Sequence, residues 1–147
     1  MNYTIYFVEI LKDYLERNSL TITEFAANVG MTEAGLSKWM TGKSYPSLIY
    51  LIKVADFFDC SLDYLVGRSE IADYVSATQK QNFCNRLDYL LTTNNKTFYQ
   101  LAKACKFGCP IYAKWKKGIK PKPENLISIA DYFNVSLDYL VGRSDSV

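Results

Sequence analysis

Hydrophobic residues in the first sixty positions recur every three or four residues, which is the spacing of one face of an α-helix. Polar residues that favour helix ends separate these stretches, so the pattern predicts several short helices joined by tight turns. The first helix is expected where one apolar face is formed by Phe7, Ile10, Leu11, Tyr14 and Leu15.

Capping residues indicate where the next helices begin and end. Thr21 and Glu24 have the spacing of a capping box, in which each side chain satisfies a free backbone donor at a helix start, and Thr97 with Gln100 has the same spacing. Gly30 ends the second helix, because glycine adopts a left-handed backbone without strain. The later helices are expected from Thr32 to about Met40, from Pro46 or Ser47 to about Phe58, and from Ser61 to Gly67.

The pattern occurs twice. Residues 61–69 recur unchanged as residues 136–144, and 15 of the 24 positions from Pro46 are identical at this offset of 75. Before Gly42 the copies match at an offset of 76. The sequence therefore predicts an all-α fold of two tandem five-helix domains. The expected parts are a first domain at 5–69, a linker at 70–81 and a second, divergent domain at 82–144.

In the first copy, small Ala26, the Gly30 turn and Leu36 together describe two helices that meet over a short turn, a helix-turn-helix. The ordered segments are Thr21–Gly30, Leu36–Trp39, Gly42–Lys43, Pro46, Leu51–Ala55 and Ser61–Gly67. As a series they resemble the helix-turn-helix DNA-binding domains of phage repressors, including lambda repressor, and Cro, the xenobiotic-response-element type (XRE) family. The resemblance covers about residues 11–67 and, less fully, residues 87–142.

This resemblance implies double-stranded DNA as the partner, with the third helix of copy one in the major groove. Carried over position by position, the base-facing residues are Thr32, Glu33, Ala34, Gly35, Ser37 and Lys38. The residues that contact phosphates in this copy are Thr23, Lys43 and Ser44. Ala34 and Gly35 offer few hydrogen bonds, so direct readout is expected to be sparse. The alternative for Glu33 and Lys38 is a pair of solvated charges on an exposed helix face.

Copy two differs where copy one is expected to read DNA. Its third helix is expected at Gly108–Lys117, and Cys109, Pro110 and Ala113 at reader positions cannot make bidentate contacts to bases. Lysines follow instead, and the resemblance makes phosphate contacts of Lys114, Lys116, Lys117 and Lys120, with Lys122 beside them. Copy two is therefore expected to hold DNA without reading it.

The charges divide in the same way. Residues 1–69 contain 6 basic and 8 acidic side chains, whereas residues 82–147 contain 10 basic and 5 acidic ones, which favours a polyanionic partner for the second half. Family members pair through their late helices, so a homodimer and an intrachain pseudo-dimer are both open. A further alternative is that copy two binds a protein partner and that its lysines only solvate the surface.

The leading expectation is a sequence-preferring DNA-binding transcriptional regulator. Repression is expected, because the chain ends at Val147 with no room for a sensing or catalytic domain. The alternative is a protein–protein interaction module on a helix-turn-helix scaffold, such as an antitoxin-like or phage-encoded partner, with little DNA binding.

Other classes of function have little support in the composition. The chain has no histidine, which excludes histidine-based acid–base and nucleophilic catalysis, and no catalytic constellation is present, so no enzyme is expected. The four cysteines lack metal-ligand spacing and are expected to be buried thiols, with no metal, cofactor or small-molecule ligand. Trp39 and Trp115 are expected in the core. With no membrane span or signal peptide, the expected location is cytoplasmic.

Overall fold

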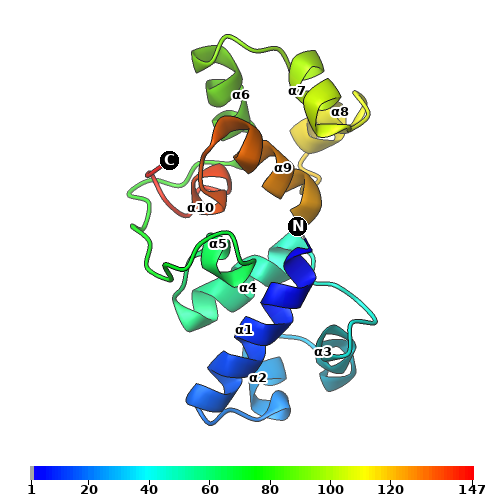
Figure 1. The fold of residues 1–147 in the computed structure, drawn as a ribbon, viewed down its shortest axis with the longest axis vertical. Coiled ribbons are helices and arrows are strands. Elements are labelled where there is room, and N and C mark those ends of the chain that lie inside the picture. The colour runs from blue at the N-terminus through cyan, green and yellow to red at the C-terminus, as the bar shows by residue number, and fades with distance from the viewer. Residues whose placement is uncertain (1) are drawn as a thin grey trace. The chain divides into compact units, whose positions relative to one another are not determined.

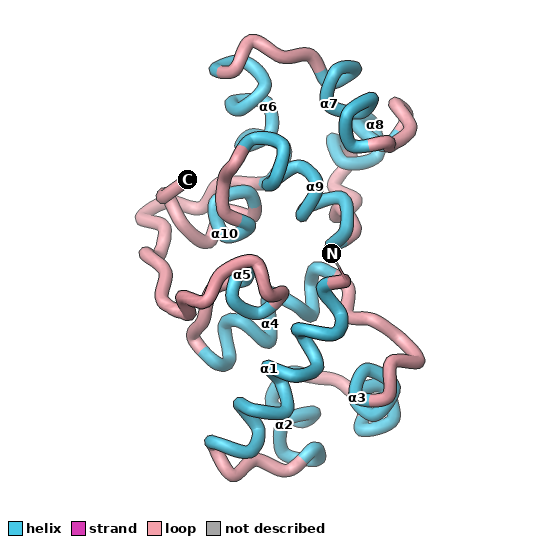
Figure 2. The backbone as a smooth tube through the Cα atoms, in the orientation of Figure 1, coloured by secondary structure: helices cyan, strands magenta, loops and turns pink. Residues whose placement is uncertain are grey.

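The computed structural model describes residues 2–147, and these form ten α-helices joined by loops, with no strand beyond one isolated bridge (Figures 1 and 2). The expected all-α class is confirmed. The chain divides into two compact units, unit 1 (Met1–Asp73) and unit 2 (Tyr74–Val147). The helices of unit 1 are α1 (Tyr3–Arg17), α2 (Ile22–Val29), α3 (Glu33–Met40), α4 (Leu48–Phe58) and α5 (Leu62–Leu65). Those of unit 2 are α6 (Phe83–Thr93), α7 (Phe98–Cys105), α8 (Ile111–Lys116), α9 (Pro123–Phe133) and α10 (Leu137–Leu140).

The core of unit 1 is built from the hydrophobic positions that recur along its helices. On α1, Phe7, Leu11 and Leu15 are buried, while Ile10 and Tyr14 of the same expected face are half-buried. The other core residues come from all four remaining helices and include Phe25, Leu36, Trp39, Leu51, Val54 and Leu65. The hydrophobic stripe of each short helix is therefore covered by its neighbours, which stabilises helices too short to persist alone.

The core of unit 2 is centred on Trp115, which is 3% exposed. Its ring is met edge-on by Phe83 at 5.3 Å, Phe98 at 5.9 Å and Phe107 at 5.6 Å between ring centroids. Trp39 of unit 1 is 5% exposed. Both tryptophans are thus core residues, as the sequence predicts, and each unit contains one of the two.

The helix ends lie close to the expected positions because their caps are local. The hydroxyl oxygen of Thr32 accepts a hydrogen bond from the Gly35 amide at 3.0 Å. The Thr97–Gln100 pair forms both bonds of the capping box. At Thr21 the threonine half is present, since its hydroxyl oxygen accepts from the Glu24 amide at 3.1 Å. These bonds satisfy amides that a helix leaves free at its start.

One helix end in unit 2 has a residue that is poorly suited to its backbone. α7 ends at Lys106 with φ of 62°, a left-handed conformation, at the position where α2 ends in Gly30. Lys106→Gly is expected to raise the free energy of unfolding of unit 2 by about 1 kcal/mol, because glycine has no Cβ to clash there. Lys103→Gly, inside the same helix, is the matched control and should lower it by about 1 kcal/mol. Urea unfolding measures both, and an equal sign for the two variants would contradict the prediction.

The repeated nine-residue segment makes the same contacts in both units. Asp63 forms an ion pair with Arg68, and Asp138 forms one with Arg143. The backbone N–H of each arginine also donates to the backbone oxygen of its aspartate, at 2.8 Å in both units. Both ion pairs are nearly buried. Each one links a one-turn helix, α5 or α10, to the residues that follow it in the chain. The identical sequence thus corresponds to an identical local structure.

None of the helices described combines the length with the apolar character that crossing a bilayer requires.

Candidate nucleic-acid interface

The helix pair α2 and α3 presents one surface of unit 1 to the outside. Gly30, with φ of 71°, turns the chain between the two helices. Leu36 and Trp39 are 0% and 5% exposed and hold the inner side of α3 against the core. Ala26, 2% exposed on α2, allows close approach of the helices. The outer side of α3 is therefore not covered by the core of unit 1.

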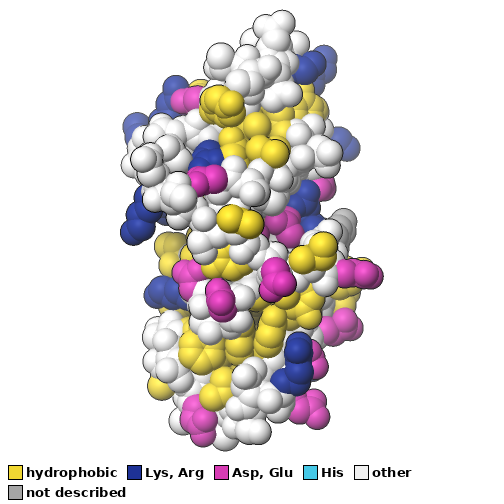
Figure 3. Space-filling model, turned by 90° about the vertical axis from the view of Figure 1, so that its left-hand side faces the viewer, with side chains coloured by type: hydrophobic (Ala, Val, Ile, Leu, Met, Phe, Trp, Pro, Cys, Tyr) yellow, Lys and Arg dark blue, Asp and Glu magenta, His cyan; other side chains and the backbone are white. Residues whose placement is uncertain are grey.

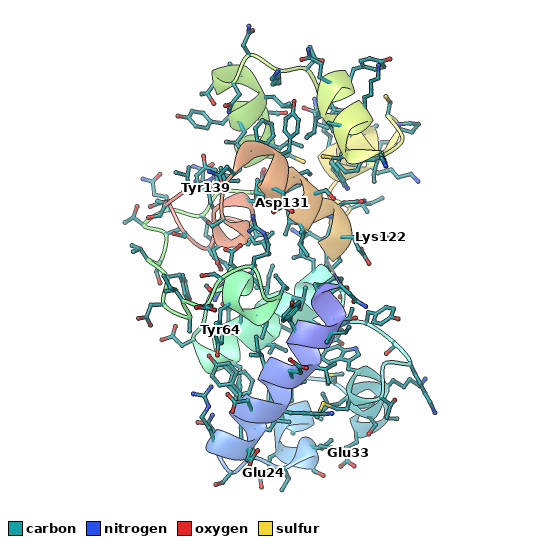
Figure 4. The ribbon with its side chains drawn as sticks, in the orientation of Figure 1. Glu24, Glu33, Tyr64, Lys122, Asp131 and Tyr139 are labelled. Atoms are coloured by element: carbon teal, nitrogen blue, oxygen red, sulfur yellow. The ribbon has the colours of Figure 1, made fainter. Side chains whose placement is uncertain are left out.

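The outer face of α3 is formed by the residues expected to face bases. Positions 33, 34, 37 and 38 lie on one side of a helix because they differ by one or by about one turn. The structure places Thr32, Glu33, Ala34, Ser37 and Lys38 at the exposed surface and leaves Gly35 half-buried. Glu33 lies at the first turn of α3 (Figure 4). The six positions are thus adjacent in space, and their contacts to bases remain a prediction.

The two charged residues on this face have no internal partner. Within residues 2–147, neither the Glu33 carboxylate nor the Lys38 ammonium forms an ion pair. The hydroxyl of Thr32, in contrast, already accepts the cap bond from Gly35. Glu33 and Lys38 therefore keep their full hydrogen-bonding capacity for a ligand, whereas part of that of Thr32 serves the helix.

A shallow groove connects this face with the loop that follows α3. It has a volume of about 620 Å³, and its lining includes Thr32, Gly35, Ser44, Tyr45 and Tyr50. A Cβ at Gly35 would lie 3.2 Å from the Thr32 hydroxyl oxygen, which is tighter than ordinary van der Waals contact, so the space beside this cap suits glycine. The groove brings a position expected to face bases and a position expected to contact a phosphate to one surface.

The loop after α3 is held in place by backbone bonds. The amides of Lys43 and Ser44 both donate to the backbone oxygen of Lys38, at 2.8 and 3.3 Å. Lys43 is exposed and Ser44 half-buried, while Thr23 is exposed on the first turn of α2. A fixed loop loses little conformational freedom on binding, which favours its expected role in contacting the phosphate backbone of DNA.

The corresponding helix of unit 2 is shorter than expected. The sequence predicts a helix over Gly108–Lys117, but α8 begins only at Ile111. Cys109 and Pro110 lie before it in a turn, where the Tyr112 amide donates to the Cys109 oxygen at 3.3 Å. The reason is that proline has no amide hydrogen and disfavours helical backbone in the residue before it. Two of the positions that align with expected base-facing residues of unit 1 are therefore outside the helix.

Polar and aromatic contacts tie α8 to the rest of unit 2. Tyr112 stands where α3 has Leu36, stacks on Phe98 at 4.3 Å, and donates its hydroxyl to Asp88 of α6. Burial, together with Asp88, raises the pKa of Tyr112 well above its usual value, so the hydroxyl stays a donor. The ammonium of Lys116 lies 4.3 Å from the centre of the Tyr112 ring. α8 is thus fixed in orientation by side chains of two neighbouring helices.

Lysines surround the end of α8 and the loop before α9. Lys114, Lys116, Lys117, Lys120 and Lys122 are all exposed, and Figure 4 labels Lys122 at the start of α9. Unit 2 contains 11 basic and 5 acidic residues, a net charge of +6, whereas unit 1 contains 6 and 10, a net charge of −4. On the face shown in Figure 3, dark blue basic side chains predominate on unit 2 and magenta acidic ones on unit 1.

The four cysteines are free thiols that differ in their burial. The Cys84 thiol donates to the Trp115 backbone oxygen at 3.1 Å, and burial raises the pKa of Cys84 and of Cys105. Cys60 is buried and Cys84 and Cys105 are half-buried, so the expectation of buried thiols holds in full only for Cys60. It is wrong for Cys109, which is exposed because it lies in the turn before α8. In the part of the chain that the structure describes, no three Cys, Asp or Glu side chains gather as metal ligands.

A comparison with known families identifies the surface built by α2 and α3. Residues 11–65 match the family described as Helix-turn-helix. This part of unit 1 is a helix-turn-helix domain. The match includes all of α2, α3, α4 and α5 and the C-terminal part of α1 from Leu11 on.

The curated relative and the solved structure that match are both regulators by name. The HTH-type transcriptional activator BcrR of Enterococcus faecalis is 25% identical over 84 residues, which are 57% of this chain and 41% of that protein. The alignment thus covers less than half of the length of this relative. The crystal structure of a transcriptional regulator from Listeria innocua is 25% identical, with a TM-score of 0.40 over 66% of this chain and 83% of that chain.

One residue of the helix-turn-helix surface escapes the sequence analysis. Tyr45, in the loop after α3, is 60% exposed and lines the groove beside Gly35. Its position between Lys43 and Pro46, outside any helical apolar face, is the signal that could have marked it. An exposed aromatic ring next to a lysine and a serine adds a stacking and hydrogen-bonding group to the surface.

Proposed function

We propose that the protein is a sequence-preferring, double-stranded DNA-binding transcriptional regulator that inserts α3 into the major groove. The observation that carries this proposal is the outer face of α3: it is exposed, its charges have no internal partners, and it lies within the matched helix-turn-helix domain. A capped helix held to its core by Leu36 and Trp39 presents these side chains rigidly. In this geometry Lys38 reaches guanine or a phosphate, and Glu33 accepts from cytosine.

We further propose that unit 2 is a second, divergent copy of the same domain that holds phosphates without reading bases. Its five helices follow in the same order as those of unit 1, and the net charge of +6 supplies what the acidic unit 1 lacks for binding a polyanion. Because the two copies are covalently linked, one chain then acts as a pseudo-dimer that covers two segments of DNA about one helical turn apart, of which only the segment under unit 1 is read.

The direction of regulation is proposed to be repression through occupation of a promoter. The curated relative is named an activator, and the alignment covers 41% of that protein. A reporter assay must therefore detect a rise as well as a fall in transcription from a bound promoter. A rise would replace repression with activation while leaving DNA binding as the function.

The decisive experiment is selection of bound sequences from a pool of random double-stranded DNA, followed by titration of the best sequence from about 50 to about 200 mM salt. An enriched motif whose affinity falls steeply with salt is the expected result. Salt-sensitive binding with no motif would reduce the proposal to non-specific DNA binding. No binding at the lowest salt would overturn it.

The readout by α3 can be tested with a charge-neutral double variant. Glu33→Ala with Lys38→Ala is expected to change the selected motif at the positions these side chains contact, at a cost of about 1–3 kcal/mol of discrimination for each lost base contact. Lys12→Ala with Glu16→Ala, two exposed residues of α1, is the matched control because it also leaves the net charge unchanged. An unchanged motif in the first variant would contradict the assignment.

A second function is favoured by one feature of unit 2. Tyr89, Tyr99 and Ile119 are 59%, 65% and 56% exposed, and phosphate contacts make no use of such large apolar side chains. Such residues suit a protein partner, so unit 2 is the candidate for the interaction-module alternative. If replacing the lysines of unit 2 lowers the salt-dependent affinity for DNA, the result favours DNA as the partner of unit 2. If the affinity for DNA is unchanged, the result favours a protein partner.

A further inference from the structure

The segment that connects the units, residues 74–81, is held along its length by unit 2. The Ala77 amide donates to the Arg143 backbone oxygen at 2.9 Å, and the Arg143 guanidinium lies 4.3 Å from the centre of the Tyr74 ring. Ser76 and Ser144 form an antiparallel bridge beside these contacts. The connecting segment therefore lies on residues 143–147, which we call the clasp.

The carboxylate of Asp145 is the polar centre of the clasp. It accepts from the Thr78 amide at 3.0 Å, from the Thr78 hydroxyl at 2.9 Å and from Arg86 of α6 at 3.0 Å. These bonds, with those of Thr78 foremost, hold the pKa of the Asp145 carboxyl below its usual value. One side chain thus joins the connecting segment, the clasp and a helix of unit 2.

Arg86 gives this contact a rigid base. The residue is only 8% exposed, and its guanidinium lies 4.1 Å from the centre of the Tyr139 ring. A buried cation strongly favours a charged hydrogen-bond partner, because leaving it unpaired is costly. Asp145 supplies that partner, although it belongs to the exposed segment of residues 145–147.

Unit 1 holds the other side of the connection. The Ser61 amide donates to the Ala72 oxygen at 2.7 Å, and the Ser61 hydroxyl donates to the Ile71 oxygen at 3.1 Å. The chain is therefore bound to unit 1 as far as Ala72 and to unit 2 from Tyr74. Of the 12-residue linker that the sequence predicts, only the neighbourhood of Asp73 lies between these contacts.

We propose that the clasp sets the length of the flexible connection between the two units. With the clasp closed, the connection pivots near Asp73. With it open, residues 74–81 join the free chain, and eight extended residues span at most about 28 Å. This is close to the distance of about 34 Å that separates successive turns of the DNA helix. The consequence rests on the proposed function: a closed clasp fixes the distance along DNA between the base contacts of unit 1 and the phosphate contacts of unit 2, and an open one permits several distances.

The state of the clasp can be measured without DNA. In the full chain, the amides of Ala77 and Thr78 are expected to be protected from hydrogen exchange, and Asp145→Ala should make them exchange at least about tenfold faster, as loss of a charged acceptor implies. Thr78→Val should act in the same direction, and it leaves the ion pair between Arg86 and Asp145 in place. Thr92→Val, at an exposed threonine of α6, is the matched control and should leave these amides unchanged. Unprotected amides in the unaltered protein, or unchanged exchange in both clasp variants, would overturn the clasp.

The effect on reach needs a second measurement on the same variants. Small-angle X-ray scattering should show a larger maximum dimension for Asp145→Ala and Thr78→Val than for Thr92→Val, with equal helix content. On DNA that carries the motif read by unit 1, the region protected from nuclease should extend a fixed distance beyond the motif for the unaltered protein and over a broader range for the clasp variants. An unchanged dimension despite fast exchange would overturn the role in reach. Failure of the unaltered protein to bind DNA would count against the proposed function, while exchange and scattering still decide on the clasp.

Discussion

Trp39→Ala is expected to lower the free energy of unfolding of unit 1 by about 3–5 kcal/mol. The indole is 5% exposed and meets the rings of Phe7 and Tyr50 edge-on, each at 5.6 Å between centroids. Its loss leaves a large cavity under α3. At roughly 0.05–0.15 kcal/mol per residue, unit 1 (Met1–Asp73) has about 4–11 kcal/mol of stability, and the substitution removes a large share of it. We therefore expect unit 1 to be strongly destabilised in this variant and DNA reading to be weakened.

Each unit contains one tryptophan, which makes the measurement selective. In Trp39→Ala the remaining fluorescence comes from Trp115 and reports only on unit 2. Urea titration should show an early loss of helix by circular dichroism and an unchanged transition by fluorescence. Tyr45→Ala, at a 60% exposed ring close to the same helix, is the control and should change stability by no more than about 0.5 kcal/mol. A single transition at the original urea concentration would contradict the core role of Trp39.

Neutralising two lysines of unit 2 is expected to have the largest effect on DNA affinity. Lys116→Gln with Lys117→Gln should weaken binding to every sequence alike and reduce the slope of log affinity against log salt by about one unit for each lysine. The reason is that a lost phosphate contact also loses the release of counterions. The selected motif should stay the same, because these side chains lie at the end of α8 and in its C-cap, away from base-reading positions.

The control for this double variant removes the same charge elsewhere. Lys12 on α1 and Lys96 before α7 are both exposed and lie outside the proposed interface, so Lys12→Gln with Lys96→Gln should change the slope little. Equal slopes for the two double variants would show that unit 2 does not hold phosphates through α8. The interaction-module alternative would then be the better account of unit 2.

The helices and the position of the candidate surface could be predicted because both depend on residues close together in the chain. A cap such as Thr32 to Gly35 spans three positions, and the exposed face of α3 follows from the spacing of Leu36 and Trp39 on its other side. The repeated Asp138–Arg143 contact spans five positions and is the same in both units. Such features survive in any fold that contains the segment.

The sequence by itself therefore determined the all-α class, the helix order and the face of α3 that is offered to a partner. Only the tertiary structure decided that α8 is anchored through Tyr112 to Asp88, 24 positions away, and that Asp145 binds Thr78 and Arg86 across 67 and 59 positions. The physical reason is that a local hydrogen bond is set by helical geometry, whereas the partner of a distant side chain is chosen by how the helices pack. For the same reason the sequence could not show that residues 71 and 72 of the predicted linker bond to Ser61 and that residues 74 and 76–78 contact residues 143–145, since these partners lie outside the linker.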